Sequence, residues 1–419
     1  MLRRIVSRSR LFLLGLFLVT TFVTTCLAGP VGVYLALSAA LASLVFTFDK
    51  EALVVALRDW GVRGFVLSFF VIWLSFLPSA KSFDDVLGFL DFLALPVVIP
   101  AFALLLRFSS ESRVTAVAAL ATLGALVALG TGLYEVHVLG YPRAEGNTSP
   151  IFFSGMAVLL CFFSMLGLVS SNARWRWIFL LGNAAGFAAA ILGGTRGAML
   201  GYGVLFVVFA GYTVFVWKRP IALRLLSVGT VLLSTLAFSV TFFDTERVAS
   251  IGTIATEAAT TGNVTDASTN QRFIIYSAAI QSFLDSPIYG HGWWNRFAAA
   301  VPYMGQLGVE THARDNHAHL HNDILNFGSA GGIIAIIGYL ILMASPIVSA
   351  FRSPRSDIRA VRITAALGLV GAYMAMGAVD TMFVFEVPKS LFVLWSAVIM
   401  AFLVERRVES GRPEGVAQG

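Results

Sequence analysis

Long apolar runs separated by short polar connections dominate the chain and predict helices that cross a membrane. Such a helix needs ~20 mostly apolar residues, and runs this continuous do not suit the alternating strands of a membrane barrel. The pattern predicts a fold class of all-α polytopic membrane protein with about 12 transmembrane helices. The predicted spans cover residues 11–28, 30–48, 63–80, 86–107, 113–134, 151–170, 175–193, 198–217, 221–243, 323–350, 361–383 and 387–404.

One long polar connection interrupts this pattern, at residues 244–322. Loops of this length without a role are uncommon. Within it, the mixed apolar pattern of Asn270–Asp285 predicts a helix that lies on other helices or on the membrane surface, and Asp285–Gly292 reads as a turn. We therefore divide the chain into residues 1–243 with nine spans, the large loop with its amphipathic helices, and residues 323–419 with three spans and a short tail.

Composition and charge support this division and predict its orientation. Hydrophobic residues make up 58% of the chain and charged residues only 12%, against about 25% charged in soluble proteins. With the N-terminus in the cytoplasm, 21 of the 29 Lys and Arg residues fall on the cytoplasmic side, as the positive-inside rule requires. Both termini are therefore expected in the cytoplasm and the large loop outside it, in the periplasm if the cell has two membranes. The net charge of +6 is mainly a topology signal, so we expect no nucleic acid among the partners.

The end of the large loop carries three histidines within five residues, His317-Ala-His319-Leu-His321, directly before an apolar span. Titratable groups near hydrocarbon are costly and usually mark function. Asn322 and Asp323 are candidate N-caps for the helix that follows. A neutral imidazole in this place is suited to act as a general base.

Metal binding and a purely structural role are the competing interpretations of the histidine cluster. His312, Asp315 and Asp323 lie close enough in sequence to join the histidines as ligands. However, the chain has neither a cysteine partner nor a His-Glu-x-x-His pattern in this region. Cys26 and Cys161 both fall inside apolar spans, which implies no disulfide framework. We predict no metal and no cofactor.

Two arginines on the periplasmic side are candidate anion ligands. Arg196 lies in the glycine-rich turn Gly193–Gly197, and Arg272 opens the amphipathic segment of the large loop. A guanidinium presents a planar fork of donors to phosphate or carboxylate. The alternatives are a side chain that snorkels to lipid headgroups for Arg196 and a solvated surface charge for Arg272. Arg143, in a second outer loop over residues 135–150, is a weaker candidate.

Three motifs in this order resemble the O-antigen ligase family, within a superfamily that includes O-antigen polymerases and some protein O-oligosaccharyltransferases. The family pattern of His, then Asn, Ser or Gln, then nine residues and Gly is met at His321, Asn322 and Gly332, and the sequence departs from it at Ala335. The motifs are Gly194-Thr195-Arg196-Gly197, Arg272 leading through Ala278 to Pro287-Ile-Tyr-Gly290-His-Gly292, and His321-Asn322 followed by Gly331-Gly332.

The resemblance implies a membrane glycosyltransferase of the C type, inverting and metal-independent, at the periplasmic face of the bacterial inner membrane. Such an enzyme moves a glycan from undecaprenyl diphosphate to a sugar hydroxyl of the lipid A-core of lipopolysaccharide. By this resemblance, Arg196 and Arg272 bind the diphosphate and His321 is catalytic. His319, His317, Asn322 and Arg143 remain secondary candidates. The expected partners are the lipid-linked glycan, the lipid A-core acceptor and membrane lipids.

Two alternatives stay open. A polymerase or a transferase to protein would share the site and differ in the acceptor, although the chain ends soon after the last span without a domain to recruit a protein. A transporter of a lipid-linked solute would place charges or broken helices at mid-membrane in two related halves. Asp91 and Asp380 are the closest candidates, although both could instead lie near helix ends, and the halves show no relation.

Overall fold

The computed structural model describes residues 2–106, 113–169, 176–242, 267–305, 307, 319–354 and 357–403. Every regular element within these ranges is a helix. The longer helices are α1 (Leu2–Phe22), α3 (Pro30–Phe46), α5 (Trp60–Phe76), α8 (Arg113–Leu133), α9 (Pro150–Met165), α10 (Phe179–Gly193), α11 (Arg196–Gly211), α12 (Ile221–Phe242), α14 (Ala267–Asp285), α17 (Asp323–Arg352), α18 (Asp357–Val379) and α19 (Glu386–Ala397). The short helices are α2 (Thr25–Ala28), α4 (Lys50–Arg58), α6 (Phe83–Val86), α7 (Val98–Leu106) and α15 (Val301–Met304).

Among the described residues, eight helical segments are long and apolar enough to cross a membrane. They are Trp60–Ser79, Phe83–Leu106, Arg113–Val138, Pro150–Val169, Arg176–Gly193, Arg196–Val216, Asp323–Arg352 and Ile358–Val379. Pro30–Phe46 and Ile221–Leu233 are apolar but shorter. The protein is therefore an all-α polytopic membrane protein, as predicted, while the count of twelve spans stays a prediction.

Two predicted spans differ from the structure in a way that matters for the site. The segment expected over residues 86–107 is part of the span Phe83–Leu106, but it is not one continuous α-helix: it consists of α6, two stretches of 3₁₀-helix and α7, and Pro96, which has no backbone N–H, lies in the second stretch. The span expected over 361–383 ends at Val379. Asp380 therefore begins an irregular connection to α19, at the end of α18 that faces α14.

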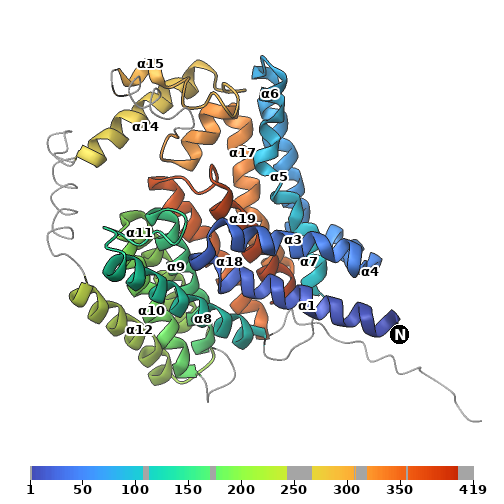
Figure 1. Cartoon of the computed structure of the whole chain (residues 1–419), viewed down its shortest axis with the longest axis vertical. Coiled ribbons are helices and arrows are strands. Elements are labelled where there is room, and N and C mark those ends of the chain that lie inside the picture. The colour runs from blue at the N-terminus through green and yellow to red at the C-terminus, as the bar shows by residue number, and fades with distance from the viewer. Residues whose placement is uncertain are drawn as a thin grey trace, which may run out of the picture.

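The long helix α17 packs along α5 through small residues. Ser68 Oγ donates to the carbonyl of Gly338 at 2.7 Å, and a Cβ on Gly338 would stand 2.7 Å from Ile72. Small side chains allow helix backbones to approach closely in a membrane. The pair forms a rigid column that carries the N-terminal end of α17 up to α14 and α15, which lie at one end of the molecule (Figure 1).

A kink near the N-terminal end of α17 receives the turn Pro287–Gly292. Gly331 and Gly332 have non-helical dihedral angles, and φ of Gly332 is +61°. The kink exposes carbonyls that accept from the backbone N–H groups of His291 (2.9 Å) and Gly292 (2.8 Å), while the N–H of Ile333 donates to the Pro287 carbonyl at 2.8 Å. A Cβ on Gly332 would lie 2.3 Å from the Ile288 backbone. The glycine pair thus serves to dock the large loop onto the bundle.

Candidate functional site

The turn between α10 and α11 presents Arg196 at the start of α11. Gly194 closes α10 in the left-handed conformation (φ 62°, ψ 37°), which a residue without Cβ adopts easily, and Thr195 is the N-cap of α11. The Arg196 side chain is exposed, and its Nη1 donates to Thr269 Oγ1 of α14 at 3.4 Å. Arg196 therefore reaches the helix that carries the second candidate arginine.

One face of α14 organises the site. Thr269, Arg272 and Tyr276 are spaced three and four residues apart, so they share a stripe of the helix. Arg272 Nη2 donates to Asp380 Oδ2 at 3.4 Å, and the Tyr276 hydroxyl donates to the carbonyl of His321 at 2.8 Å. This stripe brings together three chain segments that are far apart in sequence.

The face of α14 next to this stripe packs against a small core of its own, and Tyr276 lies at the boundary between the two. Ile275, Ala278 and Ala279 are buried against Phe297 and Leu320, and the core is completed by Ala300 and Met304. Burial of this apolar surface explains why the helix predicted over Asn270–Asp285 forms and which face it turns to the site. The predicted helix is confirmed as α14.

The N-terminus of α17 holds His321 in place. Asn322 is its N-cap, with Oδ1 accepting from the N–H of Leu325 at 3.0 Å, and its Nδ2 donates to the carbonyl of Ala378 at 2.8 Å. His321 has φ +50°, a conformation that non-glycine residues adopt rarely and that clusters at functional sites. The cap ties this residue to the end of α18.

Asp323 is not an N-cap; this part of the prediction is wrong. Its buried side chain turns inward, and Oδ1 accepts from Thr381 Oγ1 (2.8 Å) and from the N–H groups of Met382 (3.0 Å) and Phe383 (3.1 Å). These bonds fold the chain after α18 against α17. Asp380, one residue earlier, is thereby fixed opposite His321.

The Asp380 carboxylate is the centre of the cluster. Its Oδ1 lies 3.4 Å from His321 Nδ1 and 3.8 Å from His319 Nε2, and its Oδ2 lies 3.4 Å from Arg272. The side chain is only 6% exposed, whereas those of Arg272 and His321 are 31% and 29% exposed. The carboxylate is thus enclosed, while the arginine and the histidine still face outward.

Electrostatics define the charge states around Asp380. Burial favours the protonated acid, but the contacts with His319 and His321 outweigh it, so the pKa of Asp380 lies well below its usual range. Burial lowers the pKa of His319, against the opposing effect of Asp380. At neutral pH the carboxylate is therefore ionised and His319 is neutral.

Aromatic contacts complete the wall around the histidines. The His319 ring lies 4.3 Å from the ring of His321 and packs edge-on to Phe385 at 5.1 Å. Phe385 in turn packs against Phe152, at the start of α9, at 4.8 Å. These packed rings restrict the rotamers of both histidines.

The structure brings together most of the predicted site residues. Arg196, Arg272, His319, His321 and Asn322 lie where α14 meets the start of α11, the start of α17 and the end of α18. His317 lies outside the described residues, as do His312 and Asp315 of the metal interpretation. Arg143 is exposed in the separate loop before α9.

The metal interpretation takes a different form in the structure. His319, His321 and Asp380 offer ligand atoms within 4.8 Å of one another, a spacing that a cation could bridge. The predicted ligand Asp323 faces away from this group. Arg272 already places a permanent positive charge beside the Asp380 carboxylate, so the cluster does not need an ion to balance its charge.

Sequence reasoning missed Asp380 and Tyr276 as members of the site. Tyr276 follows Arg272 by one helical turn, so the same-face spacing could have revealed it. Asp380 stood out as a charged residue within a predicted apolar span, but its partners are 59 to 108 residues distant in sequence. The sequence allowed that Asp380 lies near the end of its helix, but it could not show which side chains meet it there.

Comparison with protein families finds a match that covers part of this arrangement. The family model described as O-antigen ligase matches residues 181–340. The matched segment contains Arg196, Arg272 and His321 and ends before Asp380. Comparison with curated proteins finds no match.

Proposed function

The chain belongs to the O-antigen ligase family, and from this premise we propose that it transfers a glycan from undecaprenyl diphosphate to a sugar hydroxyl of lipid A-core. The observation that carries the proposal is the convergence of two arginines and an aspartate-paired histidine on one face of α14. Membrane glycosyltransferase chemistry follows from the family; the donor and the acceptor are part of the proposal.

Arg196 and Arg272 would bind the diphosphate of the donor. As the bond between the anomeric carbon and the phosphate oxygen breaks, the electron pair leaves with the diphosphate, whose charge grows. Guanidinium groups aimed at that charge stabilise the transition state more than the ground state. Arg272 uses one nitrogen toward Asp380, which orients the rest of its fork of donors.

His321 would act as the general base. With Nδ1 facing the ionised Asp380 carboxylate, the proton of the neutral imidazole is favoured on Nδ1, and Nε2 remains a proton acceptor. Nε2 takes the proton of the acceptor hydroxyl while the oxygen attacks the anomeric carbon opposite the departing diphosphate. The configuration at that carbon inverts, and the carboxylate stabilises the imidazolium that forms.

The proposed setting is the inner membrane, with both termini in the cytoplasm and the site facing the periplasm. Both substrates are amphiphiles, so a site at the end of a helical bundle gives their lipid parts access from the bilayer. The segregation of Lys and Arg residues along the chain supports this orientation.

The first experiment measures glycan transfer by the full-length protein in lipid nanodiscs containing EDTA. We expect turnover with a lipid-linked glycan and lipid A-core, and a loss of roughly 10²–10⁴-fold in His321→Ala. His137→Ala, an exposed histidine just beyond the outer end of α8, is the matched control and should retain the rate. Activity abolished by EDTA and restored by a divalent cation would instead make His319, His321 and Asp380 a metal site.

A second experiment separates the ligase from a polymerase of the same superfamily. Deletion of the gene should leave long glycan polymers on the lipid carrier if the protein is a ligase. Accumulation of single repeat units would identify a polymerase, and loss of glycan from a protein would identify a protein acceptor. Flux of a lipid-linked solute through proteoliposomes without covalent product would favour transport.

A further inference from the structure

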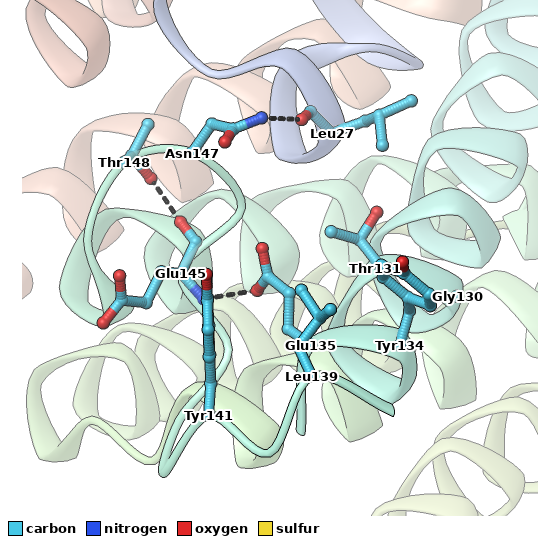
Figure 2. A pocket seen from close by; sticks show the side chains of 10 residues that line it. All are labelled: Leu27, Gly130, Thr131, Tyr134, Glu135, Leu139, Tyr141, Glu145, Asn147 and Thr148. Atoms are coloured by element: carbon cyan, nitrogen blue, oxygen red, sulfur yellow. Dashed lines mark hydrogen bonds between the residues drawn. The ribbon is translucent and has the colours of Figure 1, made fainter. Parts of the chain in front are cut away.

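A second concave site lies on the same side of the molecule, in the loop between α8 and α9. It is a cavity of about 630 Å³ whose walls include Thr131, Tyr134, Glu135, Tyr141 and Asn147. Figure 2 shows the Glu135 carboxylate between Tyr141 and Thr131, with Leu27 and Asn147 above them in the view. The volume is within the range of ~300–1,000 Å³ typical of small-molecule sites.

The walls of this cavity are held rigidly. The buried Glu135 carboxylate accepts from the N–H of Glu145 at 2.7 Å and from the N–H of Gly146 at 3.0 Å. Asn147 Nδ2 donates to the carbonyl of Leu27 at 3.0 Å, and a Cβ on Gly146 would stand 2.3 Å from the carbonyl oxygen of Cys26. Tyr134 begins a π-helical turn, Tyr134–Val138, a feature frequent at functional sites.

The chemistry of the lining selects the class of ligand. Two tyrosine rings, two carboxylates, an amide and two hydroxyls border the space, and neither Lys nor Arg is among the lining residues. Phosphate or diphosphate would meet negative charge here, so the donor's diphosphate is excluded. An uncharged polyol suits the lining, because its hydroxyls donate to carboxylate and amide oxygens and its C–H faces pack on aromatic rings.

The position of the cavity ties it to the transfer site. The N–H of Ala144 donates to the carbonyl of Leu192 at 3.0 Å, and Leu192 lies directly before the turn that presents Arg196. We propose that the cavity is a saccharide-binding subsite that holds sugar residues of one of the two substrates away from the bond being formed. This inference rests on the proposed function for the identity of its ligand.

Gly130 offers a clean way to block the cavity. It lines the space within helix α8, and a Cβ on it would meet no atom within 4 Å. Gly130→Phe therefore adds a ring to the lining of the cavity with no clash at its Cβ, and replacing glycine inside a helix favours the fold. Gly203→Phe is the matched control, because Gly203 also lies in a helix, is exposed, and would carry a Cβ that likewise meets no atom within 4 Å.

The test measures direct binding, with the full-length protein in nanodiscs and no second substrate present. The probes are two lipid-free saccharides from the bacterium that encodes this chain: core oligosaccharide and O-polysaccharide. We expect one of them to bind to the wild type and to His321→Ala alike. Gly130→Phe should weaken that binding by about tenfold or more, whereas Gly203→Phe should not. Which probe binds identifies the acceptor or the donor as the source of the sugars.

Each other outcome is informative. Equal binding by Gly130→Phe and the wild type, or binding of neither saccharide at millimolar concentration, overturns the subsite. A lipid acyl chain found in the cavity in place of sugar overturns it as well. Saccharide binding that is lost in Gly130→Phe, in a protein that transfers no glycan, supports the subsite and rejects the proposed ligase reaction. If the protein transfers glycan but Gly130→Phe binds saccharide as the wild type does, the proposed ligase reaction is supported and the subsite is rejected.

Discussion

Replacing Asp380 with asparagine removes one charge from the centre of the site and keeps the shape of the side chain. The carboxylate contacts His321 at 3.4 Å and Arg272 at 3.4 Å. If the base mechanism holds, the ionised carboxylate stabilises the imidazolium that forms as the acceptor hydroxyl loses its proton. Asp380→Asn should therefore slow the chemical step while the fold persists.

The distance sets the magnitude of this effect. Two unit charges at the observed 3.4 Å attract by about 5 kcal/mol at an effective dielectric constant of about 20. His321 is 29% exposed, so water screens part of this, and about 3 kcal/mol is a reasonable remainder. That free energy corresponds to a loss of roughly 10²-fold in kcat.

Donor binding should respond differently from the rate. Asp380 shares the charge of Arg272, so its removal leaves the guanidinium free to face the diphosphate. The dissociation constant for the lipid-linked donor should stay the same or become smaller. The assay combines initial rates at saturating donor with equilibrium binding of the donor in nanodiscs.

Asp91→Asn is the matched control for this experiment. Asp91 accepts from Trp293 Nε1 at 2.5 Å outside the site, and an asparagine oxygen can accept the same bond. A kcat within about threefold of the wild type in Asp380→Asn would refute the assignment of its carboxylate, since the Coulomb attraction would then be absent. If Asp380→Asn loses as much donor binding as Arg272→Ala does, then Asp380 acts by positioning the donor-binding residues and not by stabilising the imidazolium.

Three further substitutions test how the site is held. Tyr276→Phe removes the hydrogen bond to the His321 carbonyl. We expect kcat to fall by roughly 5- to 30-fold, from a loss of about 1–2 kcal/mol, and donor affinity to stay unchanged. Steady-state kinetics measures both quantities. Gly332→Ala places a Cβ against the loop backbone at φ +61° and should lower the unfolding free energy by about 2 kcal/mol or more, while Gly229→Ala, in open space on α12, should not lower the melting temperature. Asp323→Ala frees three buried donors and should reduce stability by about 3 kcal/mol or more and abolish turnover; a fully active, stable variant would contradict the role of Asp323 in anchoring the connection after α18.

Sequence alone determined the membrane class and the amphipathic helix α14, and it proposed two arginines and a histidine as site candidates. The membrane class follows from the length of the apolar runs, and the helix follows from the spacing of its apolar residues, so both depend on local sequence. The N-cap role of Asn322 was also predictable, because a cap involves residues three positions apart. Asp323, assigned to the same local role, instead bonds to residues 58 to 60 positions away.

Tertiary structure alone decided what surrounds these residues. The partnership of Asp380 with Arg272 and His321 depends on where α18 ends, and that end is set by bonds from Asp323 to a distant segment. The stripe on α14 forms a site only because α11 and α17 approach it. The cavity beside Glu135 exists because the loop before α9 is clamped between α2 and α10. Long-range packing in a membrane bundle follows from the fit of many small and large side chains, and no local pattern of the chain encodes that fit.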